Sequence, residues 1–166
     1  DHIQALLLMN GFDVSGGEVF LDWLDFDPAP PRVVTGCDFD VDVEQKSSRG
    51  RLPDIHVKAN QDGEKIGECL LLSASAFSRR GAVEDLAFCQ WLGIDEPYQG
   101  KGLGAHLLGR ALAEAREVGY RHAGISTAFD NHRALLFYSN FGYRAVDWTR
   151  RFRRDLARPL EASTQK

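Results

Sequence analysis

Three glycines at alternate positions, Gly100, Gly102 and Gly104, stand directly before a strongly helical run. Glycine lowers helix propensity and is costly to fix, so a helix that begins this way needs a specific reason. A strand that leads through a glycine-rich turn into a helix exposes backbone N–H groups, and these donors together with the helix dipole suit a phosphate. Lys101 adds a cation beside them. The stretch therefore predicts a site for a phosphorylated ligand.

Two other phosphate-binding patterns fit this stretch less well. The Walker pattern GxxxxGK[ST] has no match in the sequence. A dinucleotide fingerprint can be read over Gly100, Gly102 and Ala105, but Pro97 separates the preceding strand from the first glycine and no acid ends the next strand. A nicotinamide-binding module stays an alternative, whereas a plain loop explains one glycine but not three.

The same residues resemble a known family. "LGIDEPYQGKGLGAHLL" resembles the acetyl-CoA-binding motif of GNAT-type N-acetyltransferases, Q/R-x-x-G-x-G/A, through Gln99, Gly102 and Gly104. "DNHRALLFYSNFGY" is similar to the family's second motif, an asparagine that opens a helix, a tyrosine seven residues later, and a glycine–aromatic stop. The motifs occur in the family's order with a strand between them, and together they cover about residues 82–148.

The resemblance implies that the chain binds acetyl-CoA. The turn would hold the diphosphate, a strand end that leaves its neighbour at a bulge would pair with the pantetheine arm, and Asn131 would bind that arm near Tyr138. The implied cofactor-binding residues are Leu92, Gly93, Ile94, Gln99, Gly100, Lys101, Gly102, Leu103, Gly104, Asn131 and Tyr138.

The implied reaction is attack of an amine on a thioester, which needs a proton acceptor for the amine and a proton donor for the departing thiolate. Tyr138 is the expected catalytic donor, since a tyrosine stays protonated at neutral pH. Its alternative is a core aromatic on the helical face of Phe137 and Phe141. Asn131 has the alternative of a simple helix cap.

The proton acceptor is harder to place. Family members often carry a glutamate on one of two strands, where this chain has Phe88 and Ser126. Glu84 shares a face with Phe88 by alternation, and we expect it to be the catalytic base. Asp85, Glu68 and a relayed water stay open as alternatives. No metal site is expected, because Cys37, Cys69 and Cys89 are widely spaced and form no metal-type cluster.

The elements that must position these residues follow from periodicity. Apolar spacing predicts strands over 18–26, 83–94 and 123–129 and helices over 103–118 and about 130–141. Asp62-Gly63 between alternating segments predicts a hairpin. The order implies a mixed α/β fold, which the resemblance specifies as a mostly antiparallel sheet splayed at a bulge and flanked by helices.

The domain boundaries are predicted from the prolines and from one internal likeness. The linker is 28–31, the acetyltransferase-like domain 32–158 and the tail 159–166. An offset of 131 residues sets "IQALLLMNGFDV" over "ALLFYSNFGYRA". We therefore expect 1–27 to be the remnant of a preceding acetyltransferase-like domain, and the chain to be the C-terminal half of a tandem acetyltransferase.

The composition of the chain limits the classes of binding partner. A net charge of −4 over 166 residues and a pI near 5.7 argue against nucleic acid, and no apolar run reaches the length of a membrane span. We expect a cytoplasmic protein whose partner is a small-molecule or peptide amine acceptor, and which packs against a preceding domain or forms a homodimer. The predicted function is an acetyl-CoA-dependent N-acetyltransferase, with a catalytically inactive, acetyl-CoA-binding or scaffolding half as the alternative.

Overall fold

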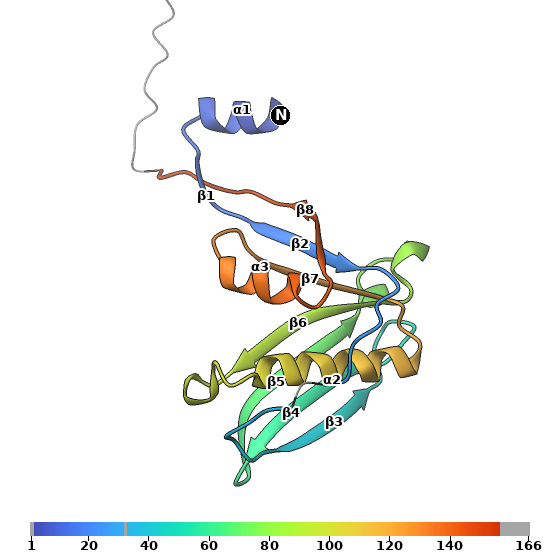
Figure 1. The fold of residues 1–166 in the computed structure, drawn as a ribbon. Coiled ribbons are helices and arrows are strands. Elements are labelled where there is room, and N and C mark those ends of the chain that lie inside the picture. The colour runs from blue at the N-terminus through green and yellow to red at the C-terminus, as the bar shows by residue number, and fades with distance from the viewer. Residues whose placement is uncertain (1, 32, 157–166) are drawn as a thin grey trace, which may run out of the picture.

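A seven-stranded sheet organises the chain in a computed structural model that describes residues 2–31 and 33–156. Its strand order is β3-β4-β5-β6-β7-β2-β8, and β1 and β9 form a separate pair (Figure 1). The strands are β1 Asp13–Gly16, β2 Glu18–Trp23, β3 Asp40–Lys46, β4 Asp54–Gln61, β5 Glu64–Ser73, β6 Leu86–Ile94, β7 His122–Ala128, β8 Arg144–Trp148 and β9 Arg151–Arg153. The helices are α1 His2–Met9, α2 Leu103–Val118 and α3 His132–Ser139, with 3-10 turns η1 Ala74–Ala76, η2 Gly81–Val83 and η3 Glu96–Tyr98.

All pairings in the large sheet are antiparallel except β6 with β7. The predicted mixed, mostly antiparallel α/β fold is therefore confirmed. The predicted hairpin joins β4 to β5, where Asp62 (φ 53°) and Gly63 (φ 82°) both adopt the left-handed conformation that such a two-residue turn requires.

The predicted splay is present between β6 and β7. The two strands pair only as far as Cys89 and Ile125, although β6 continues to Ile94. The pairing of β5 with β6 skips Gln90, which is therefore the bulged residue. The sequence predicted the divergence around Leu92 to Ile94, whereas the bulge lies at Gln90, so the separated segment is longer than expected.

The apolar face of α2 packs over β4, β5 and β6, because its apolar residues recur at helical spacing. Its fully buried residues are Leu107, Leu108, Ala111, Leu112 and Ala115. Burying each leucine contributes about 1.5 to 3 kcal/mol. Gly119 ends the helix in the left-handed conformation (φ 113°), so the helix covers the predicted residues 103–118. In Figure 1, α2 and α3 lie on the same side of the sheet.

The amino-terminal segment contributes a strand to the sheet. β2 lies between β7 and β8, and Leu21 and Phe26 are buried in the common core. The linker 28–31 crosses α2, where a Cβ on Gly109 would lie 3.4 Å from the Pro31 Cα. The tail 159–166 and the last two residues of the expected domain lie outside the described residues.

No α-helix occurs between β2 and β3 in the part of the chain that the structure describes. Among the described residues, this connection therefore places no α-helix over the face of β4, β5 and β6 opposite α2. Among the described helices, none is long and apolar enough to cross a membrane.

Candidate functional site

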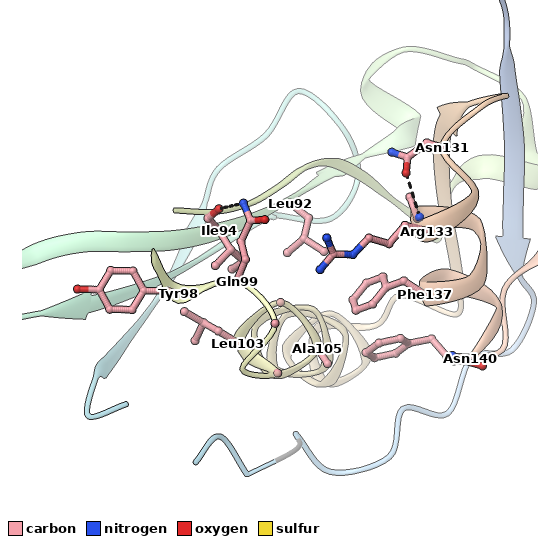
Figure 2. A pocket seen from close by; sticks show the side chains of 15 residues that line it. Leu92, Ile94, Tyr98, Gln99, Leu103, Ala105, Asn131, Arg133, Phe137 and Asn140 are labelled. Carbon is pink, nitrogen blue, oxygen red and sulfur yellow. Dashed lines mark hydrogen bonds between the residues drawn. The ribbon is translucent and has the colours of Figure 1, made fainter. Parts of the chain in front are cut away.

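A cavity of about 520 Å³ opens where β6 leaves β7, between the first turn of α2 and the helix α3 (Figure 2). Residues from the end of β6, the glycine turn, α2 and α3 line it together. They are Leu92, Ile94, Tyr98, Gln99, Gly100, Gly102, Leu103, Gly104, Ala105, Asn131, Arg133, Ala134, Phe137, Asn140 and Phe141. The structure thus brings the two sequence motifs to one place.

The turn before α2 is closed by a side-chain hydrogen bond. The Gln99 Nε2 donates to the Ile94 carbonyl oxygen at 2.9 Å. Gly100 (φ 75°) and Gly102 (φ 88°) adopt the left-handed conformation, and no heavy atom lies within 4 Å of where their Cβ atoms would stand. Backbone conformation therefore requires glycine at these two positions, and crowding does not.

Gly104 is different, because its backbone is helical. A Cβ on it would meet only the Ile94 Cγ1, at an ordinary 3.6 Å. The His106 N–H donates to the Gly102 carbonyl at 3.0 Å, so the N–H groups of Leu103, Gly104 and Ala105 lie ahead of the helical ladder. These donors and the positive end of the helix dipole face the cavity, and they suit an anion.

Asn131 begins α3, and its Oδ1 accepts a hydrogen bond from the Ala134 N–H at 3.0 Å. The cap uses only the oxygen, so the Nδ2 group remains a donor at the cavity wall. The helix-cap interpretation is therefore confirmed, and it leaves the ligand-binding interpretation available.

Arg133 was missed by the sequence reasoning. Its guanidinium extends from α3 into the cavity, toward the end of β6 (Figure 2), and it forms no ion pair with a described residue. The only signal in the sequence was weak: a cation in the first turn of a helix is unfavourable beside the positive end of the helix dipole. Phe137 and Phe141, whose rings lie 5.3 Å apart, were also missed as cavity residues.

Tyr138 lies in the core and is not among the residues that line the cavity. Its ring packs 5.1 Å from Phe137 and 5.9 Å from Tyr143, and only 8% of it is exposed. Burial, and then the neighbouring Cys89 and Cys69 thiols, raise the pKa of its hydroxyl well above the ordinary value. The structure therefore places it as the core aromatic that the sequence allowed, beside the residue at which β6 and β7 part.

Two other predicted cofactor residues do not line the cavity. The Lys101 Nζ lies 5.4 Å from the centre of the Tyr98 ring. A Cβ on Gly93 would stand 2.7 Å from the Trp91 Nε1, so glycine here gives room to the indole.

Glu84 is not brought to the cavity. It ends η2 ahead of β6, and its carboxylate lies 4.0 Å from the Arg51 Nη1 with 56% of the side chain exposed. Glu84 precedes the first residue of β6, whereas the cavity lies at the last residues of that strand, where Leu92 and Ile94 line it. We therefore assign Glu84 no part in the site. None of the residues that line the cavity is an Asp, Glu or His.

An ionisable pair lies on the face of the sheet opposite α2. Ile55 and Val57 are buried toward α2, so His56 between them faces the other side. The His56 Nε2 lies 2.9 Å from Glu68, which pairs across the strands with Gly93 of the splayed segment. A hydrogen bond from Lys65 (2.6 Å) is the largest cause that lowers the pKa of the Glu68 carboxyl, and the His56 contact adds to it.

Comparison with known proteins gives a family match. A model described as "Acetyltransferase (GNAT) family" matches residues 20–143. A search of curated proteins gives no match.

Solved structures give similarity in fold. A GCN5-related N-acetyltransferase from Sphaerobacter thermophilus superposes with a TM-score of 0.63 at 13% identity, over 90% of this chain and 54% of that chain. A GCN5-related N-acetyltransferase from Kribbella flavida gives 0.58 at 16%, over 87% and 60%. A tandem GNAT protein from the clavulanic acid biosynthesis pathway gives 0.65 at 17%, over 90% and 57%. The chain thus spans little more than half the length of these proteins.

Proposed function

Because the chain belongs to the acetyltransferase (GNAT) family, we propose that it binds acetyl-CoA in the cavity beside α2 and transfers the acetyl group to an amine. The observation that carries this proposal is the set of N–H groups of Leu103, Gly104 and Ala105. No helical carbonyl accepts a hydrogen bond from them, and they lie at a cavity that the splayed strand also lines through Leu92 and Ile94. Acetyl-CoA supplies an activated acetyl thioester.

The diphosphate fits the start of α2. Three backbone donors and the helix dipole meet it from one side, and the Arg133 guanidinium meets it from α3. A Cβ on Gly104 would enter this space without disturbing the protein itself, since only Ile94 lies nearby. The fold itself does not require glycine at this position, so the space that a ligand needs explains the missing side chain better.

The pantetheine arm fits the edge of β6. From Trp91 to Ile94 this strand pairs with β5 but not with β7, so its inner edge presents backbone groups that the sheet leaves free. An amide-bearing arm can pair with such an edge as an added strand does. Leu92 and Phe137 supply apolar walls to the same passage.

Tyr138 does not line the cavity, but it lies beside Cys89, where β6 and β7 part, and we propose that it acts from there as a proton donor on the thiol side. Its raised pKa keeps the hydroxyl protonated at neutral pH. A donor whose pKa lies above the thiol value of about 8.5 transfers its proton uphill, at about 1.4 kcal/mol for each unit, and so acts chiefly by holding a hydrogen bond to the sulfur.

The amine proton is taken up on the face of the sheet opposite α2, where His56 and Glu68 lie. Glu68 is ionised at neutral pH and accepts a hydrogen bond from the His56 Nε2–H, which leaves the His56 Nδ1 as a free acceptor. This arrangement fits a base that takes the proton directly or through water. The acceptor is a small-molecule or peptide amine, and the acidic chain favours a cationic one.

The test is release of free thiol from acetyl-CoA in the presence of a panel of amines, including polyamines, aminoglycosides and lysine peptides. We expect release with at least one cationic amine. The Tyr138→Phe variant should keep its affinity for acetyl-CoA and lose turnover on the order of 10²-fold. Gly102→Val should lose binding, and unchanged affinity in that variant would contradict the assignment of the cradle.

The lack of an Asp, Glu or His in the cavity lining favours a second candidate, a domain that binds acetyl-CoA without turnover and supports a partner domain. Tight binding of acetyl-CoA without thiol release on any amine would support this function. One similar structure is a tandem GNAT protein, and we propose that this chain too is one unit of a two-unit protein.

A further inference from the structure

Strand β2 comes from the amino-terminal part of the chain and lies inside the large sheet, between β7 and β8. It pairs antiparallel with β7 on one edge and with β8 on the other. The strand that follows β8 does not enter this sheet, and β9 instead pairs with β1. The first described strand, β1, therefore pairs with the last described strand, β9.

The two outer pairings have the same register. In β8 with β2, Arg144 pairs with Asp22, Ala145 with Leu21 and Asp147 with Phe20. In β1 with β9, Asp13 pairs with Arg153, Val14 with Phe152 and Gly16 with Arg151. Adding 131 to the number of the β1 residue and subtracting 131 from that of its β9 partner turns each β1–β9 pair into a β8–β2 pair. The irregularity falls at the same place in both pairings.

The helix ends before these strands repeat with the same offset. Gly11 (φ 74°) donates to the Leu8 carbonyl at 3.1 Å, and Gly142 (φ 117°) donates to the Ser139 carbonyl at 3.1 Å. The next residues also match, since Phe12 donates to Leu7 at 3.1 Å and Tyr143 to Tyr138 at 3.3 Å. The unit α1–β1–β2 thus repeats the helix end and the strand pairing of the unit α3–β8–β9.

The two copies meet about a local twofold axis. Glu18 and Thr149, themselves 131 residues apart, bond to each other twice: the Thr149 N–H donates to the Glu18 carbonyl at 2.8 Å, and the Glu18 N–H donates to the Thr149 Oγ1 at 3.2 Å. A Cβ on Gly17 would stand 2.1 Å from the Thr149 carbonyl oxygen, so only glycine permits this crossing. Reciprocal contact of equivalent residues is the mark of an isologous interface.

Only one of the two copies has a sheet to cover. α3 has Tyr138 buried against the core, whereas α1 buries no residue. Its apolar residues Ile3, Leu6 and Met9 are 71%, 59% and 79% exposed. α1 and β1 project from the large sheet in Figure 1, and β9 has no described strand on its second edge. A patch of this kind marks an interaction site.

We propose that residues 2–23 are the carboxyl-terminal helix and strands of another unit of the same fold within the same polypeptide, and that the two units exchange their last strands. β2 completes the sheet described here. β9 completes the other sheet, where its free edge pairs with the strand equivalent to β7, and α1 covers that sheet as α3 covers this one. The interface does not depend on acetyl transfer, because none of its strands lines the cavity.

The test uses the intact natural polypeptide, isolated from its source cells. Its mass should exceed the 18.5 kDa of this chain by roughly one domain of about 100 to 150 residues. In amide hydrogen exchange, β9 should be protected as strongly as β2, and α1 as strongly as α3. An intact mass of 18.5 kDa overturns the proposal. So does exchange at α1 and β9 as fast as at the exposed segment around Val33.

Two equivalent substitutions give a second measurement. Phe152→Asp in β9 should speed amide exchange in α1 by at least tenfold and leave exchange in β4–β6 unchanged. Leu21→Asp in β2 should speed exchange in β4–β6 and leave exchange in α1 unchanged. Val33→Asp, at a residue that is 88% exposed, is the control and should change neither region. If Phe152→Asp leaves α1 unchanged, β9 does not complete a second sheet and the proposal fails.

Discussion

The side-chain amide of Gln99 donates a 2.9 Å hydrogen bond to the carbonyl oxygen of Ile94, and so ties the start of the glycine turn to the end of the splayed strand. This contact fixes the angle at which α2 leaves β6. It therefore sets the distance between the free amides of α2 and the free edge of β6, which a single ligand must span.

Gln99→Ala should weaken binding of acetyl-CoA. Loss of one hydrogen bond costs about 1 kcal/mol, which corresponds to about a fivefold rise in Kd. The measurement is isothermal titration calorimetry. Gln45→Ala is a matched control, since it removes a 2.7 Å bond to Glu114 that lies away from the cavity. Equal losses of affinity in both variants would contradict the role given to Gln99.

Gly102→Ala and Gly104→Ala should separate the fold from the ligand. Gly102 is left-handed, so a Cβ there strains the backbone by about 1 kcal/mol and lowers both stability and affinity. Gly104 is helical, so alanine there should preserve or raise stability by up to about 1 kcal/mol. Its Cβ should nevertheless block the anion and raise Kd at least tenfold.

The stability of both variants is measured by urea denaturation, and their affinity for acetyl-CoA by calorimetric titration. Gly104→Ala that binds acetyl-CoA as tightly as the unmodified protein would mean that no phosphate approaches the start of α2.

Arg133→Ala should raise the Kd for acetyl-CoA about tenfold or more, because a guanidinium–phosphate pair is worth about 1.5 to 3 kcal/mol. The dependence of affinity on salt should also become less steep. Arg110→Ala removes the same charge from α2 at a residue bonded to Glu114, and it should leave the affinity unchanged. A salt dependence that is the same in both variants would exclude direct contact with the phosphates.

Alkaline pH should destabilise the fold. The pKa values of Tyr120, Tyr138 and Tyr143 are raised by burial, so the folded state holds their protons more tightly than the unfolded state. Their contribution is complete below the unfolded value of about 10, and it is lost as the pH rises above that value.

The free energy of unfolding should therefore fall from about pH 10 upward, as followed by urea denaturation. Tyr138→Phe should fall less steeply because it lacks one of the three groups. Parallel curves for the two proteins would show that Tyr138 ionises with its ordinary pKa.

His56→Gln should lower kcat/KM for the amine on the order of 10²-fold, because it removes the group proposed to take the amine proton. Lys58→Gln, on the same strand and face, is the control and should keep the rate. An unchanged kcat/KM in His56→Gln would exclude His56 as the base.

The fold and the glycine turn could be predicted from the sequence because both rest on local rules. Glycines at 100 and 102 signal a left-handed turn, and the period of α2 defines its buried face. Asn131 was placed correctly as a cap for the same reason. The bulge at Gln90 carried no signal, since any residue can occupy such a position and pairing with β5 determines it.

Long-range placement accounts for what was missed. Glu84 has the right alternation but lies on the wrong side of the splay, which periodicity does not reveal. Arg133 and His56 depend on contacts between elements that lie far apart in the sequence. The likeness of the segments around Gly11 and Gly142 was visible, but only the strand register shows that their strands pair with each other's copies.

The position of β2 has a consequence for how the protein is made. Trp23 pairs with Ala123, so the ribosome releases this strand about one hundred residues before its partner exists. Until then an apolar strand with two open edges must stay clear of other nascent chains. A protease that nicks the proline linker after assembly would leave a strand held only by its neighbours, and one that cuts earlier would leave a sheet that cannot close.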